Sequence, residues 1–162
     1  MKIWITIFLA GVLLTGCGAE PALETIADEL AEPVQAPVAR IQVELPDEAA
    51  LPAMESSESR LYLCEDYEIL IQTLDGGDLE ETVRTLTGYG TDKLTLVQTR
   101  QDGLRRYDFV WVSTGEKGEM VGRAVILDDG NYHYTMTVLH PAEDTENTQI
   151  VWRRVFESFS LA

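Results

Sequence analysis

The chain has 162 residues and a formal net charge of −16 at pH 7, with 28 Asp and Glu against 12 Lys and Arg. A field of this sign repels phosphate backbones, so we expect no nucleic-acid partner. The same field opposes docking on an anionic bilayer surface, so any attachment to a membrane must come from another source.

The N-terminal segment is a short apolar run behind one cation. Lys2 precedes an uncharged stretch over residues 3–14, and the run ends shortly afterwards at Cys17. A membrane-spanning helix needs about 20 apolar residues. This shorter run with a positive start is typical of a cleaved signal peptide. We therefore predict a signal peptide over residues 1–16.

The tetrapeptide Leu14-Thr15-Gly16-Cys17 resembles the lipobox of bacterial lipoproteins. The resemblance implies cleavage before Cys17 and a diacylglycerol on its thiol, and two acyl chains give stable anchoring. We expect a lipid-anchored protein on the extracytoplasmic face of the cell membrane. Gly18 is not the Asp of a retention signal, so outer-membrane sorting is open if the cell has that membrane. The alternative is an ordinary signal peptide followed by an accidental cysteine.

Residues 17–38 are predicted to be the lipidated cysteine and a flexible acidic linker. They contain Pro21, Pro33 and Pro37 among Ala and Glu, and few large apolar side chains. Such a stretch cannot bury enough surface to offset the entropy of ordering the chain. We expect it to act as a spacer, followed by one folded domain over residues 39–162.

Three strands and a helix open the folded part. The strands are predicted over residues 40–45, 60–64 and 67–74, from apolar alternation or from runs of β-branched and apolar residues. Residues 47–59 are predicted to be a loop. Asp78 is typical of a helix N-cap, and an apolar stripe at i, i+4 and i+7 starts at Leu79. Glycines at 88 and 90 end the predicted helix.

An antiparallel meander follows, with strands predicted over residues 94–100, 104–112, 119–127 and 132–139. The first turn contains Asp102-Gly103, a strong hairpin signal because glycine accepts positive φ. Residues 109–112 and 124–127 are consecutively apolar, which implies cover on both faces of the sheet. A C-terminal helix ending near Ser158 supplies the second cover. Its apolar stripe is predicted to hold Ile150, Val151, Val155, Phe156 and Phe159, with Trp152 at its edge.

These elements predict an α+β fold with an antiparallel sheet of six to seven strands and helices that cover the sheet. Their order, with residues 41–46 at the start and Phe156-Glu157-Ser158-Phe159 at the end, resembles the PsbP/DcrB-like family. The resemblance implies a PsbP-like α/β/α sandwich and a binding or assembly role. It carries over no site residue, and fold analogy does not settle function.

The chemistry-bearing residues indicate neither catalysis nor a metal or other cofactor. His133 and His140 are seven residues apart on one predicted strand, so their side chains lie on opposite faces and cannot share an ion. The oxygens of residues 128–131 could hold calcium, but a hairpin turn explains them more simply. We predict no catalytic residue, and a hydrolase is the least favoured function. Cys64 reads as a small buried hydrophobe, with a reactive thiol as the alternative.

One cluster suggests a partner surface, consisting of Arg105, Tyr107, Arg123 and His133 on the meander. Aromatic side chains beside arginine favour interfaces, and core packing under a helix is the competing interpretation. The leading prediction is a non-catalytic binding or structural lipoprotein with an envelope-protein partner. The alternative is a lipoprotein that binds a small ligand or ion and serves a transporter.

Overall fold

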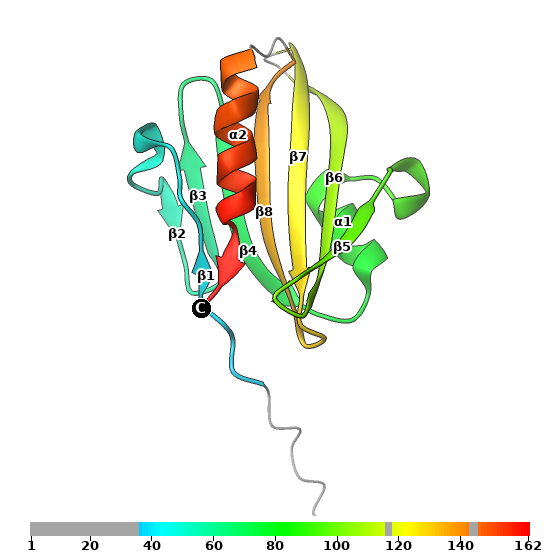
Figure 1. Ribbon diagram of the computed structural model, residues 1–162. Helices are drawn as coiled ribbons and strands as arrows, with labels where there is room; N and C mark the ends of the chain where they lie inside the picture. Colours follow the sequence, from blue (N-terminus) through cyan, green and yellow to red (C-terminus); the bar gives the residue numbers. More distant parts are fainter. Residues whose placement is uncertain (1–35, 116–117, 143–145) are drawn as a thin grey trace, which may run out of the picture. The chain divides into compact units, whose positions relative to one another are not determined.

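A seven-stranded antiparallel sheet with the order β2-β3-β4-β8-β7-β6-β5 forms the centre of the fold (Figure 1). The computed structural model describes residues 36–115, 118–142 and 146–162. The predicted signal peptide, Cys17 and all but the end of the predicted linker lie outside the described residues. The sheet strands are β2 (Met54–Glu55), β3 (Ser59–Leu63), β4 (Glu68–Asp75), β5 (Val97–Gln101), β6 (Leu104–Gly115), β7 (Gly118–Asp128) and β8 (Tyr132–Pro141).

The predicted meander is confirmed as β5-β6-β7-β8, with each strand antiparallel to the next. Its first turn has φ of 50° at Asp102 and 85° at Gly103, the positive values that a tight hairpin turn requires. The last strand of the meander also pairs with β4 along its length. This pairing places β8 in the interior of the sheet and joins the two halves of the chain.

The first predicted strand does not join this sheet. Its hydrogen-bonded part is only β1 (Ile41–Gln42), which pairs with β9 (Ser160–Leu161) at the C-terminus. The alternation still gives the correct side, because Ile41, Val43 and Leu45 all pack against the main core. The seventh sheet strand is instead β2, within the predicted loop. Alternation identifies the buried side of a segment, whereas its ladder partner depends on a distant part of the chain.

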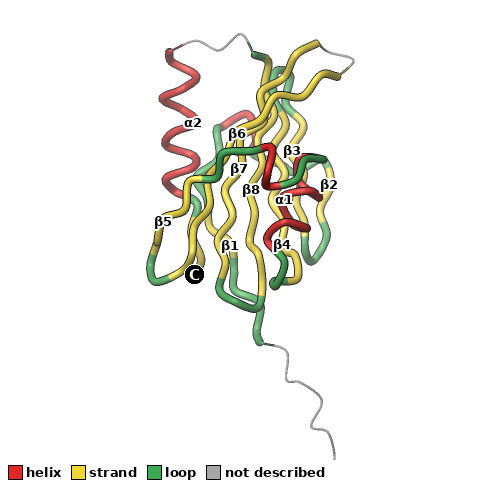
Figure 2. Tube along the Cα trace, turned by 90° about the vertical axis from the view of Figure 1, so that its right-hand side faces the viewer, coloured by secondary structure: helices red, strands yellow, loops and turns green. Residues whose placement is uncertain are grey.

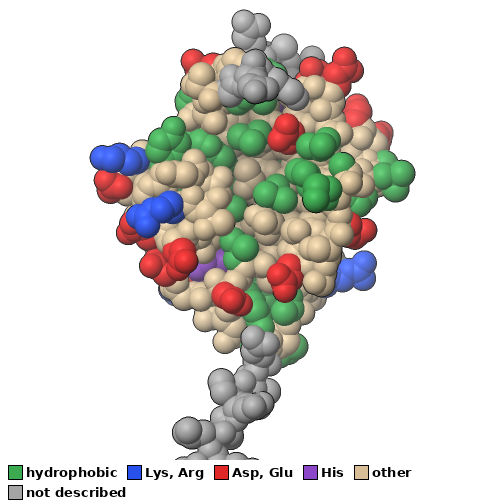
Figure 3. Space-filling view, turned by 180° about the vertical axis from the view of Figure 1, so that it is seen from behind, with side chains coloured by type: hydrophobic (Ala, Val, Ile, Leu, Met, Phe, Trp, Pro, Cys, Tyr) green, Lys and Arg blue, Asp and Glu red, His purple; other side chains and the backbone are tan. Residues whose placement is uncertain are grey.

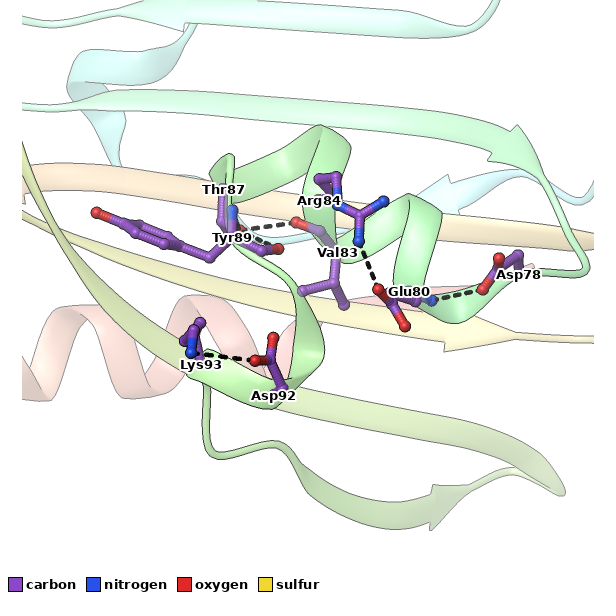
Figure 4. Close-up of polar contacts among 8 residues, drawn as sticks. All are labelled: Asp78, Glu80, Val83, Arg84, Thr87, Tyr89, Asp92 and Lys93. Atoms are coloured by element: carbon purple, nitrogen blue, oxygen red, sulfur yellow. Dashed lines mark hydrogen bonds and ion pairs between the residues drawn. The ribbon is translucent and has the colours of Figure 1, made fainter.

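Helix α1 (Leu79–Thr87) packs on one face of the sheet and matches its sequence signals (Figure 4). The Asp78 carboxylate accepts a hydrogen bond from the Glu80 N–H, and Gly88 takes the left-handed conformation at the C-terminal end. Val83 is fully buried in a cluster with aromatic side chains of β6. The predicted i, i+4, i+7 stripe is therefore the packing face of this helix.

Helix α2 (Glu146–Ser158) lies on the opposite face, as the edge-on view shows (Figure 2). Its buried side chains are Trp152, Val155 and Phe156, and Phe159 continues the row. These positions recur at i, i+3, i+4 and i+7, the spacing of one helical face. The predicted stripe was wrong at its N-terminal end. Ile150 is 58% exposed, whereas Trp152, predicted at the edge, is only 4% exposed.

The helix α2 covers the sheet incompletely. It lies over the β4–β8 region, and no helix of the described residues covers the part of β6 and β7 beside it on this face (Figure 1). The cover expected for residues 124–127 is confirmed, because all four are fully buried. For residues 109–112 the expectation was wrong, since Val110 is 53% exposed. No helix within the described residues is long and apolar enough to cross a membrane.

Candidate functional site

The predicted partner surface is not one surface. Tyr107 is opposite Ile126 in the ladder and faces α1, whereas Arg123 is opposite Val110 and faces α2. Tyr107 and His133 are also buried, at 7% and 1% exposure. The sequence alone does not fix the register between β6 and β7, which puts Tyr107 and Arg123 on opposite faces. The prediction was therefore wrong, and only Arg123 lies beside the uncovered part of the sheet.

His133 belongs to a buried polar network under α1, which the exposed Arg105 joins from the surface. The Thr82 hydroxyl lies 2.7 Å from His133 Nδ1, and His133 Nε2 lies 3.6 Å from Asp128 Oδ2. The same carboxylate oxygen binds the Arg105 guanidinium at 2.8 Å. Although the order of hydroxyl, imidazole and carboxylate resembles a catalytic relay, all three groups are buried. The network instead ties α1 to the sheet.

We expect Thr82→Val to lower the free energy of unfolding by about 1–3 kcal/mol. Valine keeps the shape of threonine but leaves His133 Nδ1 buried without its hydroxyl partner. The matched control is Thr85→Val on the exposed side of the same helix, with an expected change within about 0.5 kcal/mol. Urea unfolding measures both, and equal losses would contradict the role given to the Thr82 hydroxyl.

The acidic turn after β7 is a hairpin turn held by its own side chains. Asp129 Oδ1 accepts the N–H groups of Asn131 and Tyr132, and Asp128 accepts that of Gly130. Partial burial alone would raise the pKa of Asp129. The N–H groups of Asn131 and Tyr132 and the Tyr134 hydroxyl outweigh burial, and the pKa of Asp129 is lowered. Among the described residues no group of three or more His, Cys, Asp or Glu could hold a metal ion.

Cys64 directly follows β3 and is half-buried. It is therefore neither the fully buried hydrophobe nor the exposed reactive thiol that the sequence allowed. Its thiol donates to the carbonyl oxygen of Glu48 at 3.7 Å. The neighbouring Tyr67 is packed edge-on against Trp152, with ring centroids 4.8 Å apart. Burial raises the pKa of Tyr67 strongly, and Cys64 and Glu48 add to the effect. The Cys64 thiol and the Tyr67 hydroxyl are therefore packed at the margin of the main core.

A groove lies between α2 and the uncovered strands, and we call it the α2 groove. It consists of two cavities of about 430 and 370 Å³, which share Val110 and Arg123. Volumes of this size are typical of small-molecule sites. The first cavity is lined by Val110, Val121, Arg123, His140, Ala142, Gln149, Trp152 and Arg153. The second is lined by Thr95, Val97, Asp108, Phe109, Val110 and Arg123.

Arg123 is the central cation of the α2 groove. Its guanidinium carbon lies 4.1 Å from the centroid of the Phe156 ring, which holds the group by its face. The N–H donors of a guanidinium lie in its plane, so a ring beneath it leaves them available. Burial lowers the pKa of Arg123, which Asp108 partly opposes. No carboxylate of the described chain pairs with Arg123 within 4 Å.

Trp152 and His140 form the wall of the first cavity. Their rings are stacked with centroids 6.1 Å apart and planes 18° apart. The Trp152 indole nitrogen is buried and has no hydrogen-bond partner in the described part of the protein. An unpaired buried donor costs free energy, and this indole N–H is one. Arg153 adds a second cation on the exposed side of the helix.

Arg106 links the strands to the C-terminal end of α2. Its guanidinium binds both oxygens of Asp108, at 2.7 and 2.8 Å, and donates to the Phe156 carbonyl at 3.1 Å. It also donates to Gln101, whose amide nitrogen donates to the Phe159 carbonyl at 2.9 Å. Asp108, the carboxylate that lines the α2 groove, is therefore already paired with a cation.

Among the described residues, the other face of the domain has no comparable cluster of cations. Figure 3 shows Asp and Glu side chains across this face, with Lys and Arg only toward its margins. Two sequence signals point to the α2 groove instead. Arg123 interrupts an apolar strand immediately before residues 124–127, and Trp152 is adjacent to Arg153. Neither signal shows that Arg123 on β7 and Trp152 on α2 meet, because β8 and its two connections separate them in the chain.

No protein-family model and no curated protein matches this chain. Among solved structures, the chain is similar to a crystal structure from Bacteroides thetaiotaomicron VPI-5482, determined at 1.50 Å resolution. The match has 12% sequence identity, covers 75% of this chain and has a TM-score of 0.50. This chain spans 45% of the length of that chain. At this identity the match supports the mixed α and β fold alone.

Proposed function

We propose that this protein is a lipid-anchored, non-catalytic binding module on the extracytoplasmic face of the cell membrane. The anchor is a diacylglycerol on Cys17, and residues 18–38 space the domain from the bilayer. We further propose that the domain is a PsbP-like α/β/α sandwich. The arrangement of an antiparallel sheet between α1 and α2 supports this assignment.

The observation that carries the binding role is the donor-rich α2 groove. Its first cavity has two guanidinium groups and an imidazole, and no carboxylate among its described lining residues. The size of the two cavities favours a small ligand over a macromolecular partner. This favours the second candidate function, a small-ligand-binding lipoprotein that serves a transporter.

The lipid anchor is tested by the two cysteines of the chain. Cells that express the full chain are labelled with palmitate, and we expect the label on the protein to be lost in Cys17→Ala. The matched control is Cys64→Ala, which removes the other thiol and is expected to keep the label. The wild-type protein is expected to stay with membranes after a salt wash, since salt removes only electrostatic attachment. Label retained in Cys17→Ala would contradict the anchor.

The binding role is tested without assuming what the ligand is. The full-chain protein is purified in mild detergent from the membranes of the cells that express it, and its mass is measured by native mass spectrometry. We expect a non-covalent small-molecule adduct that is lost in Val110→Trp, because the larger side chain fills the floor of the groove. Leu63→Trp is the control, since Leu63 has a similar exposure on β3, outside the groove. An adduct that survives Val110→Trp would place binding elsewhere, and a co-purifying protein in place of the adduct would favour a macromolecular partner.

A further inference from the structure

We propose that the α2 groove binds a small carboxylate with an apolar body. The inference rests on the binding role proposed above and adds the chemical class of the ligand. The carboxylate lies against Arg123, with Arg153 beside it. The apolar body lies along the valines of β5, β6 and β7.

The carboxylate end follows from the donors in the first cavity. An arginine fork binds a carboxylate through two parallel N–H···O bonds. The guanidinium of Arg123 is held on the Phe156 ring, so it is positioned before a ligand arrives. Arg153 lines the same cavity and adds a second guanidinium group. Because these groups only donate, they favour a ligand end that only accepts.

The apolar body follows from the exposed floor of the groove. Val97 and Val110 are both more than half exposed, and they line the second cavity next to Arg123. Val121 continues the apolar floor into the first cavity. Apolar side chains gathered around a few convergent polar groups are typical of small-molecule sites. An ion as small as acetate would leave this floor uncovered.

The charges that face Arg123 come from β6 and α2, two of each sign. Asp108 on β6 and Glu157 on α2 attract it, whereas Arg106 on β6 and Arg153 on α2 repel it. Asp108 is bound at both oxygens by Arg106. Burial of the Arg123 guanidinium reduces solvent screening, which strengthens its attraction to a ligand anion. The net charge of the whole chain is strongly negative, so the site depends on this local arrangement.

The test compares hexanoate with hexanamide, which has the same chain and no charge. The full-chain protein in nanodiscs of zwitterionic phosphatidylcholine is titrated with each, followed by ligand-observed NMR, with empty nanodiscs as the blank. We expect hexanoate to bind about tenfold tighter than hexanamide or better, and acetate to bind at least about tenfold more weakly than hexanoate. Equal binding of hexanoate and hexanamide would overturn the carboxylate, and equal binding of hexanoate and acetate would overturn the apolar body.

Two charge-matched variants test the position of the carboxylate. Arg123→Gln is expected to weaken hexanoate binding by about tenfold or more. Arg100→Gln makes the same charge change at an exposed position of β5 that is paired with Arg105, on the α1 face, and is expected to leave binding unchanged. Equal losses in both variants would show a general field effect and overturn the site. If Arg123→Gln does not fold, hexanoate binding is measured on Arg153→Gln, which changes an exposed position of α2.

The two proposals fail in different ways. If native mass spectrometry shows an adduct that is lost in Val110→Trp while hexanoate does not bind, the groove is a ligand site and the carboxylate class is wrong. If hexanoate does not bind and no adduct appears, the binding role of the groove is wrong as well. Loss of the palmitate label in Cys17→Ala is independent of both results.

Discussion

Phe156→Ala is expected to lower the free energy of unfolding by about 3–5 kcal/mol, the range for deleting a buried aromatic ring. Phe156 is 1% exposed and lies in the main core between α2 and the sheet. Its ring also supports the Arg123 guanidinium, so the variant loses a cation–π contact together with apolar burial. Urea unfolding followed by circular dichroism measures the loss.

The control for this prediction lies on the same helix. Ile150 is exposed, and Ile150→Ala is expected to change the free energy of unfolding by no more than about 0.5 kcal/mol. The comparison also tests which side of α2 faces the sheet. A large loss for Ile150→Ala with a small loss for Phe156→Ala would contradict the packing of α2 and, with it, the wall of the groove.

Gly122→Ala is expected to cost about 1–3 kcal/mol or more, because the added methyl group overlaps an aromatic ring. A Cβ at Gly122 would lie 2.2, 2.3 and 2.7 Å from three atoms of the Trp111 indole. These residues are direct partners in the β6–β7 ladder, on the α1 face. Trp111 is only 6% exposed, so its ring has little room to move. The midpoint of urea unfolding is expected to fall.

A double-mutant cycle isolates this overlap from other effects of the substitution. In a Trp111→Leu background the whole indole is absent, so Gly122→Ala is expected to cost less than about 0.5 kcal/mol. The coupling energy between the two sites is then close to the whole cost in the wild-type background. An unchanged cost in the Trp111→Leu background would show that the backbone of Gly122, and not the neighbouring ring, explains the effect.

The elements that depend on local signals were predicted well. The cap at Asp78, the stripe of α1 and the Asp102-Gly103 turn are local, because each depends on residues within a few positions of one another. The lipobox resemblance is likewise local, and the structure does not describe Cys17. Local sequence therefore determined the mixed α and β class and the meander, whereas the anchor on Cys17 stays a proposal.

The tertiary structure decided what local sequence could not. The alternation at Ile41 gave the buried side but not its pairing with β9, and the periodicity of α2 allowed more than one face until its packing was known. A strand's side chains alternate with period two, so a register error of one residue moves Arg123 to the other face. The α2 groove exists because α2 covers only part of the sheet and leaves Val110 exposed. Such a site depends on long-range packing between segments, and no local pattern encodes where those segments meet.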